Sequence, residues 1–287
     1  MSKIGAIDTV VNIWTPEALS VRPNWRDGFF VDKMKASNSL MSGLSLSEMI
    51  DRMDASNIEK AFLIATKAGR IGHASTYHLP PKIVFDAVQK YPERFCGLMG
   101  IDPFEGMNGV RELVKAITEY GFIGAHLYPH WFELAPDHAK YYPYYAKCCE
   151  LDIPIQLQVG QSLIYAPDYP CRSVGKPITL DSVACDFQEL KLIGIHIGIP
   201  WHDEMIAMAW KHKNIFIIAD AHSPKYWPAS FVHYIKTFGQ DKVMFGTDFP
   251  VLDWERTLRE IEALDLSDAV KKKFFHDNAK KIYKLDC

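Results

Sequence analysis

The sequence lacks several features that would assign it to a class at once. Its six cysteines include no CxxC pair, so neither a zinc ribbon nor a disulfide framework is indicated. Apolar runs are interrupted before they reach the roughly 18 uncharged residues that suggest a membrane-spanning helix. Basic residues are not concentrated anywhere, and 32 Lys and Arg against 35 Asp and Glu leave a formal charge of −3. We therefore expect a cytoplasmic protein with a small-molecule partner and with no nucleic-acid or membrane partner.

A glycine-rich dinucleotide-binding loop is also missing. In an open, doubly wound sheet, Gly-x-Gly-x-x-Gly typically follows the first strand. Here the corresponding segment reads Asp8-Thr-Val-Val-Asn12. This absence weakens the open sheet, which is the main alternative to a closed barrel for a chain of this kind.

What the sequence does contain is an alternation of short apolar runs with amphipathic segments, which is typical of βα units around a parallel sheet. No linker rich in Pro, Gly or Ser interrupts this alternation. We predict an α/β protein, a single (β/α)8 TIM barrel in one domain over residues 1–287. The predicted strands are Gly5–Trp14, Lys60–Thr66, Phe95–Asp102, Ile123–Tyr128, Ile153–Val159, Leu192–Ile197, Ile215–Ala219 and Val243–Thr247.

Two long inserts follow predicted strands, Thr15–Leu44 after the first and His130–Tyr141 after the fourth. Both fall on the C-terminal side of their strands, where the loops of such barrels form the active site. We therefore expect the inserts to border a substrate pocket.

Histidines and one aspartate occur at the ends of separate predicted strands, and in a barrel these ends meet at one mouth. These residue types serve as general acids and bases. The predicted catalytic residues are Asp248, His196, His126 and His222. The predicted substrate-binding residues are Asn12, Gln158, Tyr128 and Trp201.

Three segments carry a family resemblance when they are taken in order. They are Gly121-Phe-Ile-Gly-Ala-His-Leu-Tyr-Pro129, Leu192-Ile-Gly-Ile-His-Ile-Gly198 followed by Pro200-Trp201, and Lys242-Val-Met-Phe-Gly-Thr-Asp-Phe-Pro250. With these, the chain resembles the amidohydrolase-related barrels, a family of metal-dependent hydrolases and non-oxidative decarboxylases. The resemblance implies that Asp248 binds metal or activates water, and that His196 ligates metal or contacts the reacting group.

The chain departs from this family at its metal ligands. The His-x-His of the first strand is replaced by Val10 and Asn12, and the fifth-strand His by Gln158. A zinc site needs about three or four N, S or carboxylate ligands. We expect no tightly held metal. The alternative is a Zn or Mn ion on His196, Asp248 and His126.

The resemblance, taken with these residues, implies hydrolysis of a small cyclic or carboxylated substrate, with a lactone favoured. Asp248 would activate water, while His126, His196 and His222 would polarise the carbonyl group. Two alternatives remain open. One is a metal-dependent non-oxidative decarboxylase of an aromatic or unsaturated acid, and the other is a catalytically silent ligand-binding or partner subunit.

Two further features bear on ligands and partners. Arg22, Arg26 and Arg172 are candidates to pair with a substrate carboxylate, although each is expected to be a solvated loop charge. Barrels of the resembled family commonly associate, so a homo-oligomer is possible. The aromatic segment Tyr141-Tyr-Pro-Tyr-Tyr145 can supply an interface for it.

Overall fold

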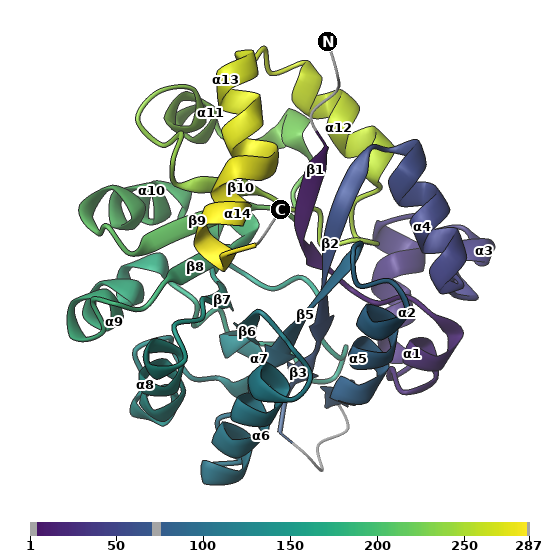
Figure 1. The fold of residues 1–287 in the computed structure, drawn as a ribbon, viewed down its shortest axis with the longest axis horizontal. Coiled ribbons are helices and arrows are strands. Elements are labelled where there is room, and N and C mark those ends of the chain that lie inside the picture. Colours follow the sequence, from purple (N-terminus) through teal and green to yellow (C-terminus); the bar gives the residue numbers. More distant parts are fainter. Residues whose placement is uncertain (1–4, 71–75, 286–287) are drawn as a thin grey trace.

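The computed structural model describes residues 5–70 and 76–285. Its main sheet has eight parallel strands in the order β1-β2-β5-β6-β7-β8-β9-β10, with helices arranged around it (Figure 1). Each predicted strand overlaps one of them, so the predicted fold is confirmed. The strands are β1 (Ala6–Val11), β2 (Ile58–Ala65), β5 (Phe95–Gly100), β6 (Gly124–Leu127), β7 (Ile155–Gln158), β8 (Leu192–Ile195), β9 (Ile215–Ala219) and β10 (Val243–Phe245).

The sheet closes where the first strand meets the segment after the last one. Val11 forms a parallel bridge with Phe249, and the hydroxyl of Thr9 donates to the carbonyl of Phe245 at 2.7 Å. The fully buried Asp8 carboxylate accepts from the Thr247 amide at 3.0 Å and from the Trp254 indole at 2.6 Å. These contacts complete a nearly closed (β/α)8 barrel.

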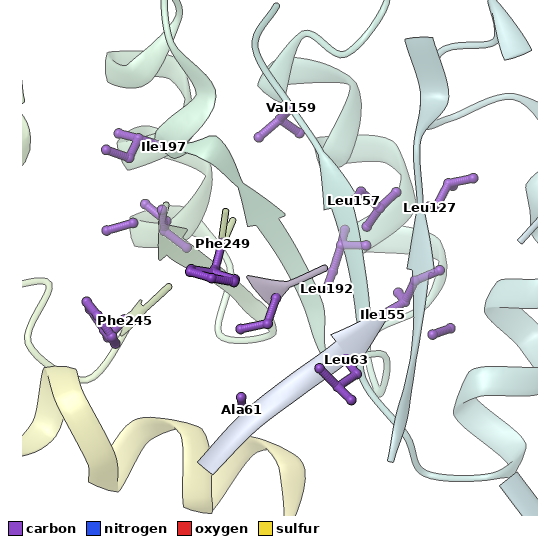
Figure 2. Packing of buried hydrophobic residues seen from close by; sticks show 14 of the residues in the cluster. Ala61, Leu63, Leu127, Ile155, Leu157, Val159, Leu192, Ile197, Phe245 and Phe249 are labelled. Atoms are coloured by element: carbon purple, nitrogen blue, oxygen red, sulfur yellow. The ribbon is translucent and has the colours of Figure 1, made fainter. Parts of the chain in front are cut away.

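Side chains alternate between the interior of the barrel and the layer beneath the outer helices, as the pleat of a strand requires. In β2, Phe62 and Ile64 belong to the interior cluster. Their neighbours Ala61 and Leu63 belong to the larger outer cluster, part of which Figure 2 shows. The strands are therefore covered on both faces, which explains their nearly continuous apolar sequences.

The outer helices follow the strands in chain order. They are α4 (Leu46–Ala55), α5 (Pro81–Lys90), α6 (Met107–Thr118), α8 (Tyr142–Glu150), α9 (Leu180–Asp186), α10 (His202–Lys211), α11 (Ala229–Lys236) and α12 (Trp254–Glu262). None of the helices in the described residues is sufficiently long and apolar to cross a membrane.

The last part of the chain covers one end of the barrel. It comprises α13 (Asp268–Lys272), the π-helical turn η6 (Lys273–Asp277) and α14 (Asn278–Tyr283). Ala279, Ile282 and Tyr283 pack against the interior cluster, and Figure 1 shows α14 in front of the strands. The C-terminal ends of the strands face away from this cover, and the long loops lie there.

Both predicted inserts contain short helical elements. The first holds α1 (Pro16–Ser20), α2 (Trp25–Gly28), η1 (Phe29–Lys33) and α3 (Asn38–Met41), and the second holds α7 (Pro129–Phe132) and η2 (Ala139–Tyr141). The hairpin of β3 (Lys67–Ala68) and β4 (Tyr77–His78) was not predicted. The remaining short turns are η3 (Pro177–Thr179), η4 (His196–Gly198) and η5 (Pro224–Tyr226).

Candidate active site

A cavity of about 190 Å³ lies at the C-terminal ends of the strands, between the strand ends and the first insert. Asn12, His196 and Asp248 line it from the barrel, and they follow β1, β8 and β10. Aromatic side chains form much of the remaining wall. They are Trp14, Phe29, Phe30, Tyr77, Tyr128 and Trp131.

Three residues that line the cavity have left-handed backbone conformations at neighbouring strand ends. The φ angles are 65° at His196, 60° at Ala221 and 55° at Asp248. For a residue with a Cβ this conformation costs on the order of 1–3 kcal/mol, and such residues cluster at functional sites. The barrel therefore holds these strand ends in a strained conformation. Two of the three strained residues, His196 and Asp248, have ionisable side chains.

His196 is held by Asp220, the residue after β9. The Nδ1 atom of His196 lies 2.8 Å from one Asp220 oxygen, and the His196 amide donates to the other at 2.6 Å. Burial lowers the pKa of His196, but the charge of Asp220, its hydrogen bond and the charge of Asp248 outweigh this effect and raise the pKa above 6.5. The proton on Nδ1 faces Asp220, so Nε2 is the ring nitrogen left for the cavity.

Asp248 is paired with Asn12 across the junction of the first and last strands. The Asn12 Nδ2 atom donates to Asp248 Oδ1 at 2.8 Å and to the carbonyl of Phe249 at 3.1 Å. Both neighbours are acceptors, so turning the amide around would place its oxygen against two oxygens. Asn12 therefore presents its NH₂ group to Asp248.

The protonation states of the cavity follow mainly from burial. Burial raises the pKa of Asp248 to about 7, although the charge of His196 and the hydrogen bond from Asn12 act in the opposite direction. Burial also lowers the pKa of His222 to about 4, with a further contribution from the charge of His196. Near neutral pH the cavity therefore offers a neutral imidazole at His222 and an acid at Asp248 that can give up its proton.

The cavity brings together six of the eight predicted site residues. They are Asn12, Tyr128, Gln158, His196, His222 and Asp248. The Oε1 atom of Gln158 is buried and has no hydrogen-bond partner among the described residues. It is an acceptor that a ligand can use.

Two predicted site residues do not line the cavity. His126 is fully buried inside the barrel, where its Nδ1 lies 2.9 Å from Gln156 Oε1, and burial lowers its pKa to about 4. Trp201 instead lies beneath the ammonium group of Lys176, 5.4 Å from it. Their direct roles stay predictions, and the structure places both side chains outside the cavity lining, because a strand end can turn a side chain inward or outward.

Sequence reasoning missed several contributors to the site. Neither a role for Asp220 nor its pairing with His196 was predicted. The segment from Gln161 to Ile164 also lines the cavity, and no motif marks it. Arg22 was expected to be solvated but is buried in the cavity wall, whereas Arg172 is exposed and the Arg26 side chain lies outside the described residues.

A protein-family model described as amidohydrolase matches residues 8–285. The chain belongs to the amidohydrolase family. It is 22% identical to the gamma-resorcylate decarboxylase of Rhodococcus jostii over 254 residues, which covers 71% of this chain and 75% of the relative. The family assignment made from the sequence is thus confirmed.

Solved structures agree on the fold. An uncharacterised TIM-barrel protein of Bordetella bronchiseptica has a TM-score of 0.80 at 21% identity, covering 98% of each chain. The 5-carboxyvanillate decarboxylase of Novosphingobium aromaticivorans, complexed with manganese, has a TM-score of 0.70 at 20% identity, covering 98% of this chain and 96% of that one. The prediction of a lactone-type hydrolase is contradicted, because these amidohydrolase relatives of known activity are decarboxylases.

Because the 5-carboxyvanillate decarboxylase is complexed with manganese, we asked whether the residues of this cavity fit a divalent metal ion. No three His, Cys, Asp or Glu side chains of the described residues converge around Asp248. The NH₂ group of Asn12 occupies Asp248 Oδ1, and an NH₂ group cannot ligate a cation. Gln158 adds a neutral oxygen only. This donor set does not fit a metal ion held by three or more side chains.

Two groups with metal-ligand chemistry do converge elsewhere in the described chain. One comprises Asp181, Cys185 and His212, and the other comprises His78, Asp102 and Glu105. In each group a lysine ammonium already binds a carboxylate, Lys211 at Asp181 and Lys67 at Glu105, both at 2.5 Å. Neither group includes a residue that lines the cavity.

Proposed function

We propose that this chain is a non-oxidative decarboxylase of an aromatic carboxylic acid. One observation carries the proposal: a buried acid with a pKa near 7, Asp248, lies in the wall of a cavity lined with aromatic rings. The decarboxylase activity of the gamma-resorcylate and 5-carboxyvanillate relatives supports the same reaction class.

The reaction needs a proton at the ring carbon that carries the carboxylate. Asp248 donates its proton to this carbon, and a C–H bond forms. The C–C bond to the carboxylate then breaks, its electron pair returns to the ring, and CO₂ leaves. Asp248 is left ionised and takes up a proton from water for the next cycle. An Asp with an ordinary pKa would be ionised near neutral pH, so the raised pKa suits this role.

The other polar groups fit a hydroxylated ring. A phenolic oxygen on the ring makes the protonated carbon electron-rich, and a protonated His196 can donate from Nε2 to that oxygen. The buried Gln158 Oε1 accepts a hydrogen bond from a hydroxyl group. No step is assigned to a metal ion, because the donor set around Asp248 does not match one.

The test is turnover of 2,6-dihydroxybenzoate and 5-carboxyvanillate in D₂O, with and without added Mn²⁺, and with Asp248→Asn as the matched variant. We expect CO₂ release, with deuterium at the carbon that lost the carboxylate. The variant should be slower by roughly 10²- to 10⁴-fold, the contribution of a general acid, with an unchanged circular dichroism spectrum. Absence of turnover for a wide panel of aromatic acids under both conditions would overturn the proposal in favour of a silent binding barrel.

A further inference from the structure

Three side chains with metal-ligand chemistry converge between two outer helices of the barrel. Asp181 and Cys185 lie four residues apart on α9, so they share one face of that helix. His212 follows directly after α10 and completes the group. One ligand atom from each residue lies within 4.8 Å of the other two. None of the three lines the cavity, so the proposed decarboxylase function leaves this group without a role.

The spacing of these atoms is close to that around a zinc ion. Zinc binds a thiolate at about 2.3 Å and an imidazole or a carboxylate at about 2.0–2.2 Å, so the ligand atoms of a tetrahedral site lie roughly 3.3–3.8 Å apart. The Nε2 atom of His212 lies 2.6 Å from Oδ1 of Asp181. Side-chain rotations that move the ligand atoms by about 1 Å therefore produce the zinc geometry. A water molecule would take the fourth position, as in zinc sites with three protein ligands.

The backbone around the group is already held in place. Asn214 is buried, and its Nδ2 atom donates to the carbonyl of Phe187, the residue after α9, at 3.1 Å. The Lys242 ammonium donates to the carbonyl of His212 at 2.9 Å. These bonds fix the end of α9 against the segment that carries His212. Only side chains need to move when an ion binds, which keeps the entropic cost of binding low.

The carboxylate of the group is charged, and the cation beside it is easily displaced. Hydrogen bonds from Lys211 and His212 lower the pKa of Asp181, so this side chain is ionised near neutral pH. The Lys211 ammonium lies 2.5 Å from Asp181 Oδ1, but its side chain is 54% exposed. An exposed ion pair contributes little to stability, so Lys211 can turn into water at low cost. A divalent ion with three protein ligands can take its place.

The mixture of donors selects the type of ion. Thiolate and imidazole ligands favour zinc, whereas manganese and magnesium prefer sites made of oxygen. We propose that Asp181, Cys185 and His212 form a zinc site that joins α9 to the residue after α10. An ion there cross-links two outer helices and stabilises the folded chain, because the unfolded chain lacks the preformed group. This inference is independent of the proposed reaction.

The test is titration of the whole chain with Co²⁺, followed by near-ultraviolet absorption, and with Zn²⁺, followed by calorimetry. We expect wild type to show the thiolate-to-cobalt charge-transfer band and to bind zinc. Loss of a group that only orients a ligand costs roughly 10- to 100-fold in metal affinity. Cys185→Ser should therefore weaken zinc binding by at least that factor and abolish the band. Cys171→Ser, a change in the loop after β7, is the matched control and should alter neither.

Removing the competing cation should have the opposite effect. Lys211→Met is expected to tighten zinc binding by up to about 5-fold, the range for an exposed ion pair. Weaker binding in this variant would count against a cation at Asp181.

Three results would overturn the site. The first is absence of the cobalt band in wild type with excess Co²⁺, and the second is persistence of the band in Cys185→Ser. The third is zinc binding that is lost in Asp248→Asn but kept in Cys185→Ser, since it would place the ion in the cavity. Turnover of aromatic acids is measured separately, so failure of the decarboxylase proposal leaves this test intact.

Discussion

The Asn12 side chain donates a 2.8 Å hydrogen bond to Oδ1 of Asp248, and these two residues lie 236 positions apart in the sequence. They follow the first and last strands, so the bond exists only when the barrel closes. This hydrogen bond stabilises the ionised form of Asp248 and lowers its pKa, whereas burial raises that pKa.

Removing this donor should raise the pKa of Asp248 further. In the proposed reaction the protonated acid is the active form, so the rate is full at low pH and falls as the pH rises through about 7. Asn12→Ala should move this fall to higher pH. The measurement is kcat/KM against pH, with Asn12→Ser as the conservative comparison, and a fall that stays in place or moves to lower pH would contradict the expectation.

Changing the same residue to Asp should create a cation site. A carboxylate in place of the NH₂ group would set two acidic side chains beside His196, a donor set that manganese accepts. We expect Asn12→Asp to bind Mn²⁺ at least about 10-fold more tightly than wild type, with Asn12→Ala unchanged. Calorimetric titration measures this, and tight binding by wild type that is lost in Asp248→Asn would show that the native donor set does hold the ion.

Asp220 should control the charge of His196. In Asp220→Asn the attraction that raises the pKa of His196 is removed, and burial then lowers that pKa. The imidazole should then lose its proton at a lower pH than in wild type, and turnover should fall by roughly 10- to 150-fold, the range for a hydrogen bond to a charged group. NMR titration of the His196 ring reports the pKa directly. The exposed Asp203, which accepts from Ser230, is the control position for an Asp→Asn change.

The raised pKa of Asp248 also predicts a pH dependence of stability. The Asp248 carboxyl has a pKa of about 7 in the folded chain and near 3.9 in the unfolded chain, so its contribution to the free energy of unfolding is fully present below pH 3.9. This contribution is lost as the pH rises toward and through 7. Asp248→Asn should therefore gain stability relative to wild type between pH 4 and 7. Urea unfolding at pH 5 and pH 8 measures the difference, and a constant difference would argue against a raised pKa.

The fold could be predicted from the sequence because short, contiguous segments are enough to indicate each strand and each helix. Each apolar run is long enough for one strand, and no break interrupts the alternation of strands with helices. The family assignment followed from short segments around His196 and Asp248, which keep their order along the chain. The hairpin of β3 and β4 escaped prediction because each of its strands has only two residues, too few to show a period.

The site could be predicted only in part. The alternation of side chains between the two faces of a strand stops where the strand ends, so the sequence pattern does not predict the direction of a side chain there. His126 and Asp248 look equivalent in the sequence, yet one faces the barrel interior and the other the cavity. The burial of Arg22 depends on Trp14 and Phe30, which meet only after the first insert folds. The orientation of the Asn12 amide depends on acceptors from the last strand, so no local pattern could reveal it.

The left-handed conformation of Ala221 has a practical meaning for anyone who engineers this barrel. Unlike His196 and Asp248, this alanine carries no functional group, and its φ of 60° suits glycine better than any residue with a Cβ. Ala221→Gly releases strain beside the proposed catalytic groups without removing any of them. Stabilisation of this barrel can therefore begin inside its candidate active site, where stabilising substitutions are usually avoided.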